Sequence, residues 1–205
     1  MRRILFQISC CGGLSGLARW SFPVPPLRNG GTANIRFCDT TLDSIAAVTI
    51  ISECYTCQKE ARFPNLPPRE MIAADDHWRV AHAFNTALPG WLVLVPRRHI
   101  GCIADLTDAE MRNLGSWQVR LSRALRDVTG CEKTYVMQFA EMEGFSHVHF
   151  HIVPRASDLN ADLRGPRVFG LMGGDHPGVL TAEEMDVIST KLSQVLSDVR
   201  QSHPG

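Results

Sequence analysis

Three histidines alternate with apolar residues in the segment His147-Val148-His149-Phe150-His151-Ile152-Val153. Successive side chains of an extended strand point to opposite faces, so this pattern predicts a strand over 147–153. One face of that strand would carry three imidazoles and the other would be apolar. The apolar face needs a covering layer of the fold, which leaves the imidazole face for a ligand, a metal ion or solvent.

A long helix is expected to supply the covering layer. Thr107 and Glu110 have the spacing of a capping box, which places the start of a helix over about 107–128. Gly130 follows as the stop signal. The apolar residues of the helix recur at helical spacing and are Leu114, Trp117, Leu121 and Leu125.

The other elements are shorter. Thr181 and Glu184 form a second capping box, which opens a last helix toward residue 200. Strand signals lie at 69–84, 91–95 and 134–140. The sequence therefore predicts an α+β fold in which a long helix packs on an antiparallel sheet and a C-terminal helix follows.

The first 45 residues differ from the rest. They begin with two arginines and an apolar patch of about six residues, shorter than the ~7–15 of a signal peptide. A turn-rich stretch without periodicity follows. We expect 1–45 to be a disordered extension or a misplaced translation start, with a signal or lipid anchor as the alternative. We expect 46–205 to be the catalytic domain with a C-terminal helical extension.

Composition narrows the possible partners and the compartment. Lysine plus arginine and aspartate plus glutamate number 21 each, so the formal net charge is zero, which argues against a duplex nucleic acid partner. The sequence has no apolar run near the ~20 residues that cross a bilayer, so no membrane partner is expected. The seven cysteines are an odd and uneven set, which favours a reducing, cytoplasmic location.

The imidazole face allows three interpretations: a polar strand face, a three-histidine metal centre or a site directed at phosphate. Side chains on one face of a strand are roughly 6.6 Å apart, so three of them span about 13 Å. That span is too long for all three to bind one ion through bonds of ~2.1 Å. The spacing favours the phosphate-directed site.

The segment HVHFHIV resembles the motif of the histidine-triad (HIT) family. The resemblance extends to PGWLVLVPRRHI at 89–100 and to Pro154-Arg155, and it covers about 50–160. It implies a HIT-like domain, commonly a homodimer, that hydrolyses or transfers nucleotides at the α-phosphate. The substrates implied are dinucleoside polyphosphates, nucleoside phosphoramidates or adenylated conjugates.

The resemblance also implies roles for the three histidines. His149 is the implied nucleophile and forms a nucleotidyl-histidine intermediate. His151 would donate to the phosphate oxygens, and His147 completes the catalytic set. A neutral imidazole suits the nucleophile if its second nitrogen donates to an acceptor, which we expect to be a backbone carbonyl.

Substrate contacts are implied for Gln138, Asn85 and Ser146. Gln138 could equally make a cross-strand hydrogen bond, and Asn85 could equally be a surface turn residue. Ser146 lies in the sequence Gly144-Phe145-Ser146, where many family members have Gly-Gln. Trp91 stands where members often have histidine after Pro-Gly.

Cys54-x-x-Cys57 could be half of a zinc site, a redox pair or a coincidence. Some HIT proteins bind zinc through two cysteines, the histidine after the strand turn and the first histidine of the triad. The resemblance therefore implies zinc held by Cys54, Cys57, His99 and His147. Four such ligands close a tetrahedral site, which makes the zinc structural.

Two rival functions remain open. The first is a nucleotide-binding or zinc-stabilised interaction module with little turnover. The second is an oxidoreductase that uses Cys54 and Cys57. The remaining cysteines and histidines are expected to be core or surface residues, and they are Cys102, Cys131, His77, His82 and His176. Three arginines could attract a polyphosphate or could simply be solvated, and they are Arg97, Arg98 and Arg155.

Overall fold

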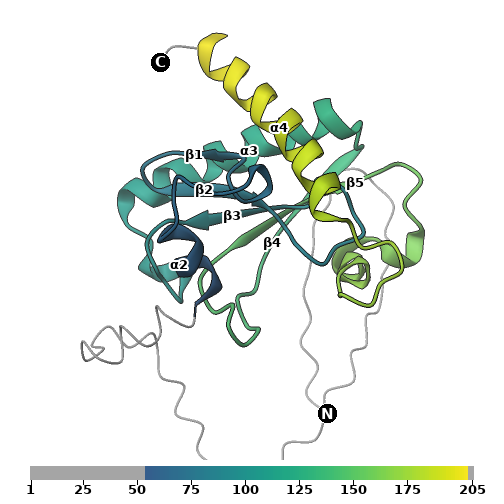
Figure 1. Ribbon diagram of the computed structural model, residues 1–205, viewed down its shortest axis with the longest axis horizontal. Helices are drawn as coiled ribbons and strands as arrows, with labels where there is room; N and C mark the ends of the chain where they lie inside the picture. Colours follow the sequence, from purple (N-terminus) through teal and green to yellow (C-terminus); the bar gives the residue numbers. More distant parts are fainter. Residues whose placement is uncertain (1–53, 203–205) are drawn as a thin grey trace, which may run out of the picture. The chain divides into compact units, whose positions relative to one another are not determined.

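Five antiparallel strands form one sheet in the order β1-β2-β3-β5-β4. The computed structural model describes residues 54–202, so the expectation for 1–45 lies outside the described residues. Figure 1 shows the sheet between helical elements. The strands are β1 (Ala73–Ala74), β2 (Trp78–His82), β3 (Leu92–Pro96), β4 (Lys133–Gln138) and β5 (Phe150–Arg155).

Alternation along the strands creates the main core on one face of the sheet. Leu92 pairs with Ile152 and Leu94 with Phe150, and these side chains are buried together in one cluster. Val148 belongs to the same cluster. The apolar half of the triad segment therefore packs inward, as the sequence predicts, and the imidazoles lie on the other face.

Two long helices cover this core. Helix α3 (Asp108–Thr129) begins at the expected capping box, in which Thr107 and Glu110 bond reciprocally, and it ends at Gly130 in the left-handed conformation. Helix α4 (Ala182–Ser202) packs beside α3 and contributes two leucines to the cluster. Both helices agree with the predicted elements within two residues.

The opposite face of the sheet is covered by short elements. Helix α2 (Tyr55–Glu60), which the sequence analysis did not predict, precedes the sheet. A segment after β5 covers a second buried cluster formed by Ala83, Trp91, Val153 and Val168. The 3-10 helices are η1 (Pro68–Glu70), η2 (Ile103–Asp105), η3 (Ala161–Leu163) and η4 (Gly165–Leu171).

The triad strand starts later than predicted. The expected strand over 147–153 is β5 from Phe150 onward, so His147 and His149 precede it. Continuing the ladder would require an N–H from Pro96, which proline lacks, and the N–H of Val148 donates instead to the Ile100 carbonyl at 2.8 Å. Within the described residues, no helix has the length and apolarity to cross a bilayer.

Candidate active site and metal site

His149 is held in one tautomer by its own backbone neighbourhood. Its Nδ1 lies 2.8 Å from the carbonyl oxygen of His147. A carbonyl can only accept, so Nδ1 carries the proton and Nε2 keeps its lone pair. The expectation that a backbone carbonyl fixes this tautomer is confirmed. His149 is half-buried, so the site is open to a ligand.

His151 lies beside His149, with ring centroids 4.9 Å apart. The indole N–H of Trp91 donates to His151 Nδ1 at 3.1 Å, which leaves the proton of a neutral ring on Nε2. Burial, with a smaller contribution from His149, lowers the pKa of His151 to about 4.

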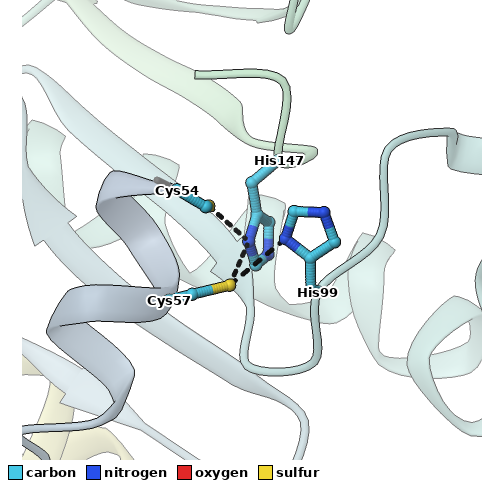
Figure 2. A group of neighbouring side chains, drawn as sticks. All are labelled: Cys54, Cys57, His99 and His147. Carbon is cyan, nitrogen blue, oxygen red and sulfur yellow. Dashed lines mark hydrogen bonds between the residues drawn. The ribbon is translucent and has the colours of Figure 1, made fainter. Parts of the chain in front are cut away.

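His147 belongs to a different group of side chains. Its Nε2–H donates to the Pro96 carbonyl at 2.9 Å, and its Nδ1 lies 3.6 Å from the sulfur atoms of both Cys54 and Cys57. Figure 2 shows His99 beside it, with His99 Nδ1 3.2 Å from the Cys57 sulfur. Because His147 and His151 are buried, the triad is not a solvent-facing polar strand face.

The four donors of this group match a tetrahedral zinc site. One ligand atom from each of Cys54, Cys57, His99 and His147 lies within 4.8 Å of all the others. Sulfur at about 2.3 Å and nitrogen at about 2.1 Å from a tetrahedral zinc are about 3.6 Å apart. The two sulfur distances from His147 have that value. A carbonyl partner on the second ring nitrogen is also usual for a histidine ligand.

Burial keeps the imidazole of His99 neutral, as a metal ligand requires, whereas the Cys57 thiol would have to lose its proton on binding a metal ion. Burial, together with the Cys54 thiol, raises the pKa of Cys57 to about 12, and burial lowers the pKa of His99. A bound zinc ion deprotonates a coordinating thiol and requires a neutral imidazole. The donor set of two sulfurs and two nitrogens thus fits zinc, and all four metal ligands implied by the resemblance lie together.

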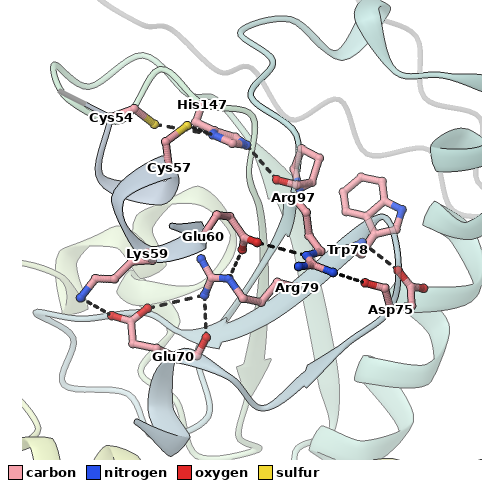
Figure 3. Close-up of polar contacts among 11 residues, drawn as sticks. Cys54, Cys57, Lys59, Glu60, Glu70, Asp75, Trp78, Arg79, Arg97 and His147 are labelled. Carbon is pink, nitrogen blue, oxygen red and sulfur yellow. Dashed lines mark hydrogen bonds and ion pairs between the residues drawn. The ribbon is translucent and has the colours of Figure 1, made fainter. Parts of the chain in front are cut away.

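An ion-pair network supports this site from below (Figure 3). Glu60, on the same helix as Cys57, accepts from Arg79 and also from Arg97 at 3.1 Å. The Arg79 side chain is only 2% exposed, and it also donates to the Glu70 carbonyl at 2.6 Å. The network therefore joins the helix that carries the cysteines to the strand and loop that precede His99.

The arginines considered for polyphosphate are paired with carboxylates of the chain. Arg97 pairs with Glu60, as described above. Arg98 contacts Glu110 at 2.9 Å, and Arg155 contacts Glu132 at 2.6 Å. Each of these three arginines therefore has a carboxylate partner within the fold.

Within the described part of the chain, the three expected substrate-contacting residues make no side-chain hydrogen bond that would hold them against the histidines. Among residues 54–202, no hydrogen bond joins the side chains of Gln138, Asn85 or Ser146 to the triad. Gln138 is the last residue of β4 and pairs with Phe150, whose side chain lies in the main core, so Gln138 lies on the sheet face opposite to that of His151. Asn85 and Ser146 are exposed, and Asn85 has a φ of 51°.

The structure brings together aromatic residues for which the sequence patterns predicted no role. Tyr55, Phe84 and Phe145 form a cluster with ring centroids 5.1–5.6 Å apart. Phe169 packs edge-on against His151 at 5.1 Å, and Phe139 packs against Phe169 at 5.6 Å. No periodicity marks Phe169, because it comes from the short 3-10 helix η4 beyond β5.

His82 is a buried structural histidine that predicts acid sensitivity. Its Nδ1–H donates to the Ala83 carbonyl at 2.6 Å, its Nε2 accepts from the Gly90 N–H at 2.9 Å, and burial lowers its pKa. The unfolded chain, with a pKa near 6.5, binds more protons below that pH. Stability is therefore complete above about pH 6.5 and falls below it.

We expect the denaturant midpoint of the wild type to fall between about pH 7 and pH 5, and to fall less in His82→Gln. The variant loses a buried acceptor, so it should be less stable at about pH 7 by about 1–3 kcal/mol. Urea unfolding at several pH values measures both effects. An unchanged pH slope in the variant would assign the acid sensitivity to other groups.

Comparisons with known proteins identify the same region. Residues 67–158 match the HIT domain family. A histidine triad protein from Bradyrhizobium japonicum is 28% identical, with 62% of this chain and 89% of that chain covered and a TM-score of 0.51. The comparison with curated proteins gave no match.

Two more distant structures share the fold. A zinc-bound histidine triad family protein from Mycobacterium smegmatis is 14% identical, covers 75% of this chain and 99% of its own, and has a TM-score of 0.55. A hypothetical histidine triad nucleotide-binding protein from Sulfolobus tokodaii is 12% identical, with coverages of 73% and 95% and a TM-score of 0.56. The family match, the fold and the triad geometry agree that residues 67–158 form a HIT domain, a family whose members are generally nucleotide hydrolases and transferases.

Proposed function

We propose that this protein is an enzyme that hydrolyses or transfers nucleotides at the α-phosphate through a nucleotidyl-His149 intermediate. The observation that carries the proposal is the hydrogen bond from His149 Nδ1 to the His147 carbonyl. It leaves an unprotonated nitrogen on a half-buried ring, beside a second histidine whose remaining proton is on Nε2. A nucleophile and a donor are thus adjacent.

The proposed reaction has two displacement steps. In the first, His149 Nε2 forms a bond to the α-phosphorus, and the bond from phosphorus to the leaving group breaks. The leaving group departs with the electron pair of that bond and is protonated by solvent or by a donor in the site. In the second step, water or another acceptor attacks phosphorus, releases the nucleotide and restores His149. His151 Nε2–H would stabilise the charge that develops on the phosphate oxygens.

The proposed substrates are dinucleoside polyphosphates, nucleoside phosphoramidates or adenylated conjugates. Gln138, Asn85 and Ser146 remain proposed contacts to the phosphate, the ribose or the leaving group. The rival is a binding or interaction module that keeps the fold with little turnover. Free thiols at Cys54 and Cys57 suit the cytoplasm, which we propose as the location.

Zinc is proposed as a structural ion held by Cys54, Cys57, His99 and His147. When bound, it supplies a cross-link and no open coordination position for substrate. His147 would bind through Nδ1 while its carbonyl orients His149. His147 would therefore bind the metal and also orient the nucleophile, whereas His149 is not one of the proposed ligands.

The experiment that tests the enzyme proposal is a substrate panel. A diadenosine polyphosphate, an adenosine phosphoramidate and a nucleotidyl sugar are incubated with the protein, and released nucleoside monophosphate is measured by chromatography. Acid-labile phosphoramidate at His149, found by mass spectrometry after rapid quenching, would support the covalent step. Nucleotide binding without any release would support the rival binding module.

We also propose a homodimer formed through the edge strand β4. Val136 on β4 is 44% exposed, and an edge strand with exposed apolar residues favours pairing with another chain. Val136→Lys should raise the dimer dissociation constant by at least about 10-fold, because an unpaired ammonium is costly to bury. Sedimentation velocity measures the change. Val187→Lys, at an exposed position on α4, is the matched control and should leave the dimer intact.

A wild-type protein that sediments as a monomer at every concentration would contradict the dimer proposal. Equal dissociation by Val136→Lys and Val187→Lys would show that the effect is one of added charge and that β4 is not the interface.

A further inference from the structure

Trp91 is a core residue, yet it makes a hydrogen bond to one of the proposed catalytic histidines. Its side chain is completely buried, and its indole N–H donates to Nδ1 of His151 at 3.1 Å. The two rings meet edge to face, with centroids 5.9 Å apart and an interplanar angle of 83°. An indole nitrogen can only donate, so this hydrogen bond fixes Nδ1 as the acceptor.

We propose that Trp91 is the positioning residue for His151, because its N–H holds the histidine proton on Nε2 and fixes the ring orientation. This inference rests on the proposed function, in which His151 Nε2–H donates to the phosphate oxygens. Trp91 itself does not touch the reacting atoms. Its contribution is to make one ring nitrogen of His151 a donor before substrate arrives.

The other neighbours of His151 cannot replace this contact. The ladder places Val93 and Met137 directly opposite it on β3 and β4, and Phe169 packs against the ring at 5.1 Å with an angle of 88°. None of these side chains offers an N–H or O–H. His149 is the titratable neighbour, and its own Nδ1 proton is bonded to the His147 carbonyl. Without the indole donor, the two neutral tautomers of His151 would compete.

The local sequence explains how the donor reaches this position. Trp91 follows the turn at Gly90, which has a φ of 82°, and its backbone N–H lies 3.3 Å from the Leu88 carbonyl. Its ring belongs to the second buried cluster, on the sheet face that carries His151. Phe169 of η4 packs against the same indole at 5.2 Å, so the Trp91 ring is held in place by a contact from η4.

The test compares Trp91→Phe with Trp78→Phe. The first variant removes the donor and keeps an aromatic ring. Trp78 is an equally buried tryptophan on the other face of the sheet, and its indole N–H donates to the Glu110 carbonyl at 3.2 Å. Both variants lose a buried indole hydrogen bond and similar volume, so a general loss of stability affects both.

The first readout is the tautomer of His151, which does not depend on turnover. Long-range ¹H–¹⁵N spectra of the histidine-labelled full chain distinguish protonated from unprotonated ring nitrogens, and His151→Gln assigns the signals. Wild type and Trp78→Phe should show His151 with the proton on Nε2 alone. Trp91→Phe should show a mixture of the two tautomers. An unchanged single tautomer in folded Trp91→Phe would overturn the inference.

The second readout is kinetic, on whichever panel substrate the wild type turns over. Trp91→Phe should lower kcat by about 10- to 100-fold with little change in KM, the size expected when an orienting partner is lost. Trp78→Phe should keep kcat within about 2-fold of wild type. A kcat for Trp91→Phe equal to that of Trp78→Phe overturns the inference and leaves the proposed function standing. An inactive wild type with the tautomer result intact removes the proposed function and retains the role of Trp91 in orienting His151.

Discussion

Replacing His149 with alanine should lower kcat/KM by about 10⁴-fold or more, the scale on which loss of a covalent nucleophile acts. The variant cannot form the phosphorus–nitrogen bond, and its neighbours cannot substitute. His151 keeps its proton on Nε2, and the His147 ring contacts a carbonyl and two sulfurs. Nucleoside monophosphate release measured over several hours would detect activity at this level.

Binding should survive the same substitution. His149 contributes one half-buried side chain to the site, so the affinity of His149→Ala for nonhydrolysable nucleotide should stay within about 10-fold of wild type. His77→Ala is the control, because His77 directly precedes β2 and is not part of the triad segment. Turnover by His149→Ala equal to wild type would assign the nucleophile to another residue.

Removing zinc should lower the melting temperature by about 8–16 °C. An ion present at about 1,000 times its dissociation constant stabilises a protein by about 4 kcal/mol. In a chain of this size, each kcal/mol shifts the melting temperature by about 2–4 °C. Calorimetry with and without a strong chelator, together with elemental analysis for zinc, measures both the effect and the stoichiometry.

Cys57→Ser should melt near the chelated wild type and should no longer respond to chelator, because its sulfur lies within 3.2–3.6 Å of both histidine ligands. Cys131→Ser is the matched control. Cys131 is a buried free cysteine of the main core, so its replacement should lower stability equally with and without chelator. A wild type that binds no zinc, with a melting temperature indifferent to zinc and chelator, would remove the metal proposal.

Local patterns predicted the parts of the fold that depend on near neighbours in sequence. The capping boxes at Thr107 and Thr181 involve residues three positions apart, and both are present. The alternation in 147–153 depends on strand geometry alone, and its apolar half is in the core. The four ligands implied by the family resemblance are together because the sheet brings distant segments into contact.

The sequence patterns could not predict contacts between residues that are distant along the chain. The start of β5 at Phe150 depends on Pro96, a residue of another strand. The apolar segment 91–95 predicted a strand, and nothing in it indicates that the indole N–H of Trp91 bonds to an imidazole. Glu60 and Arg79 belong to a helix and a strand whose proximity only the tertiary structure reveals.

The site extends beyond both ends of the family match at 67–158, since the two cysteines precede it and Phe169 follows it. The consequence concerns transplantation of the domain. A chimera that received only the matched segment would inherit all three histidines, yet it would lack the two cysteines of the proposed zinc site and the Phe169 ring that packs against His151. The smallest unit that can be exchanged between proteins with its chemistry intact therefore runs from about residue 54 through η4.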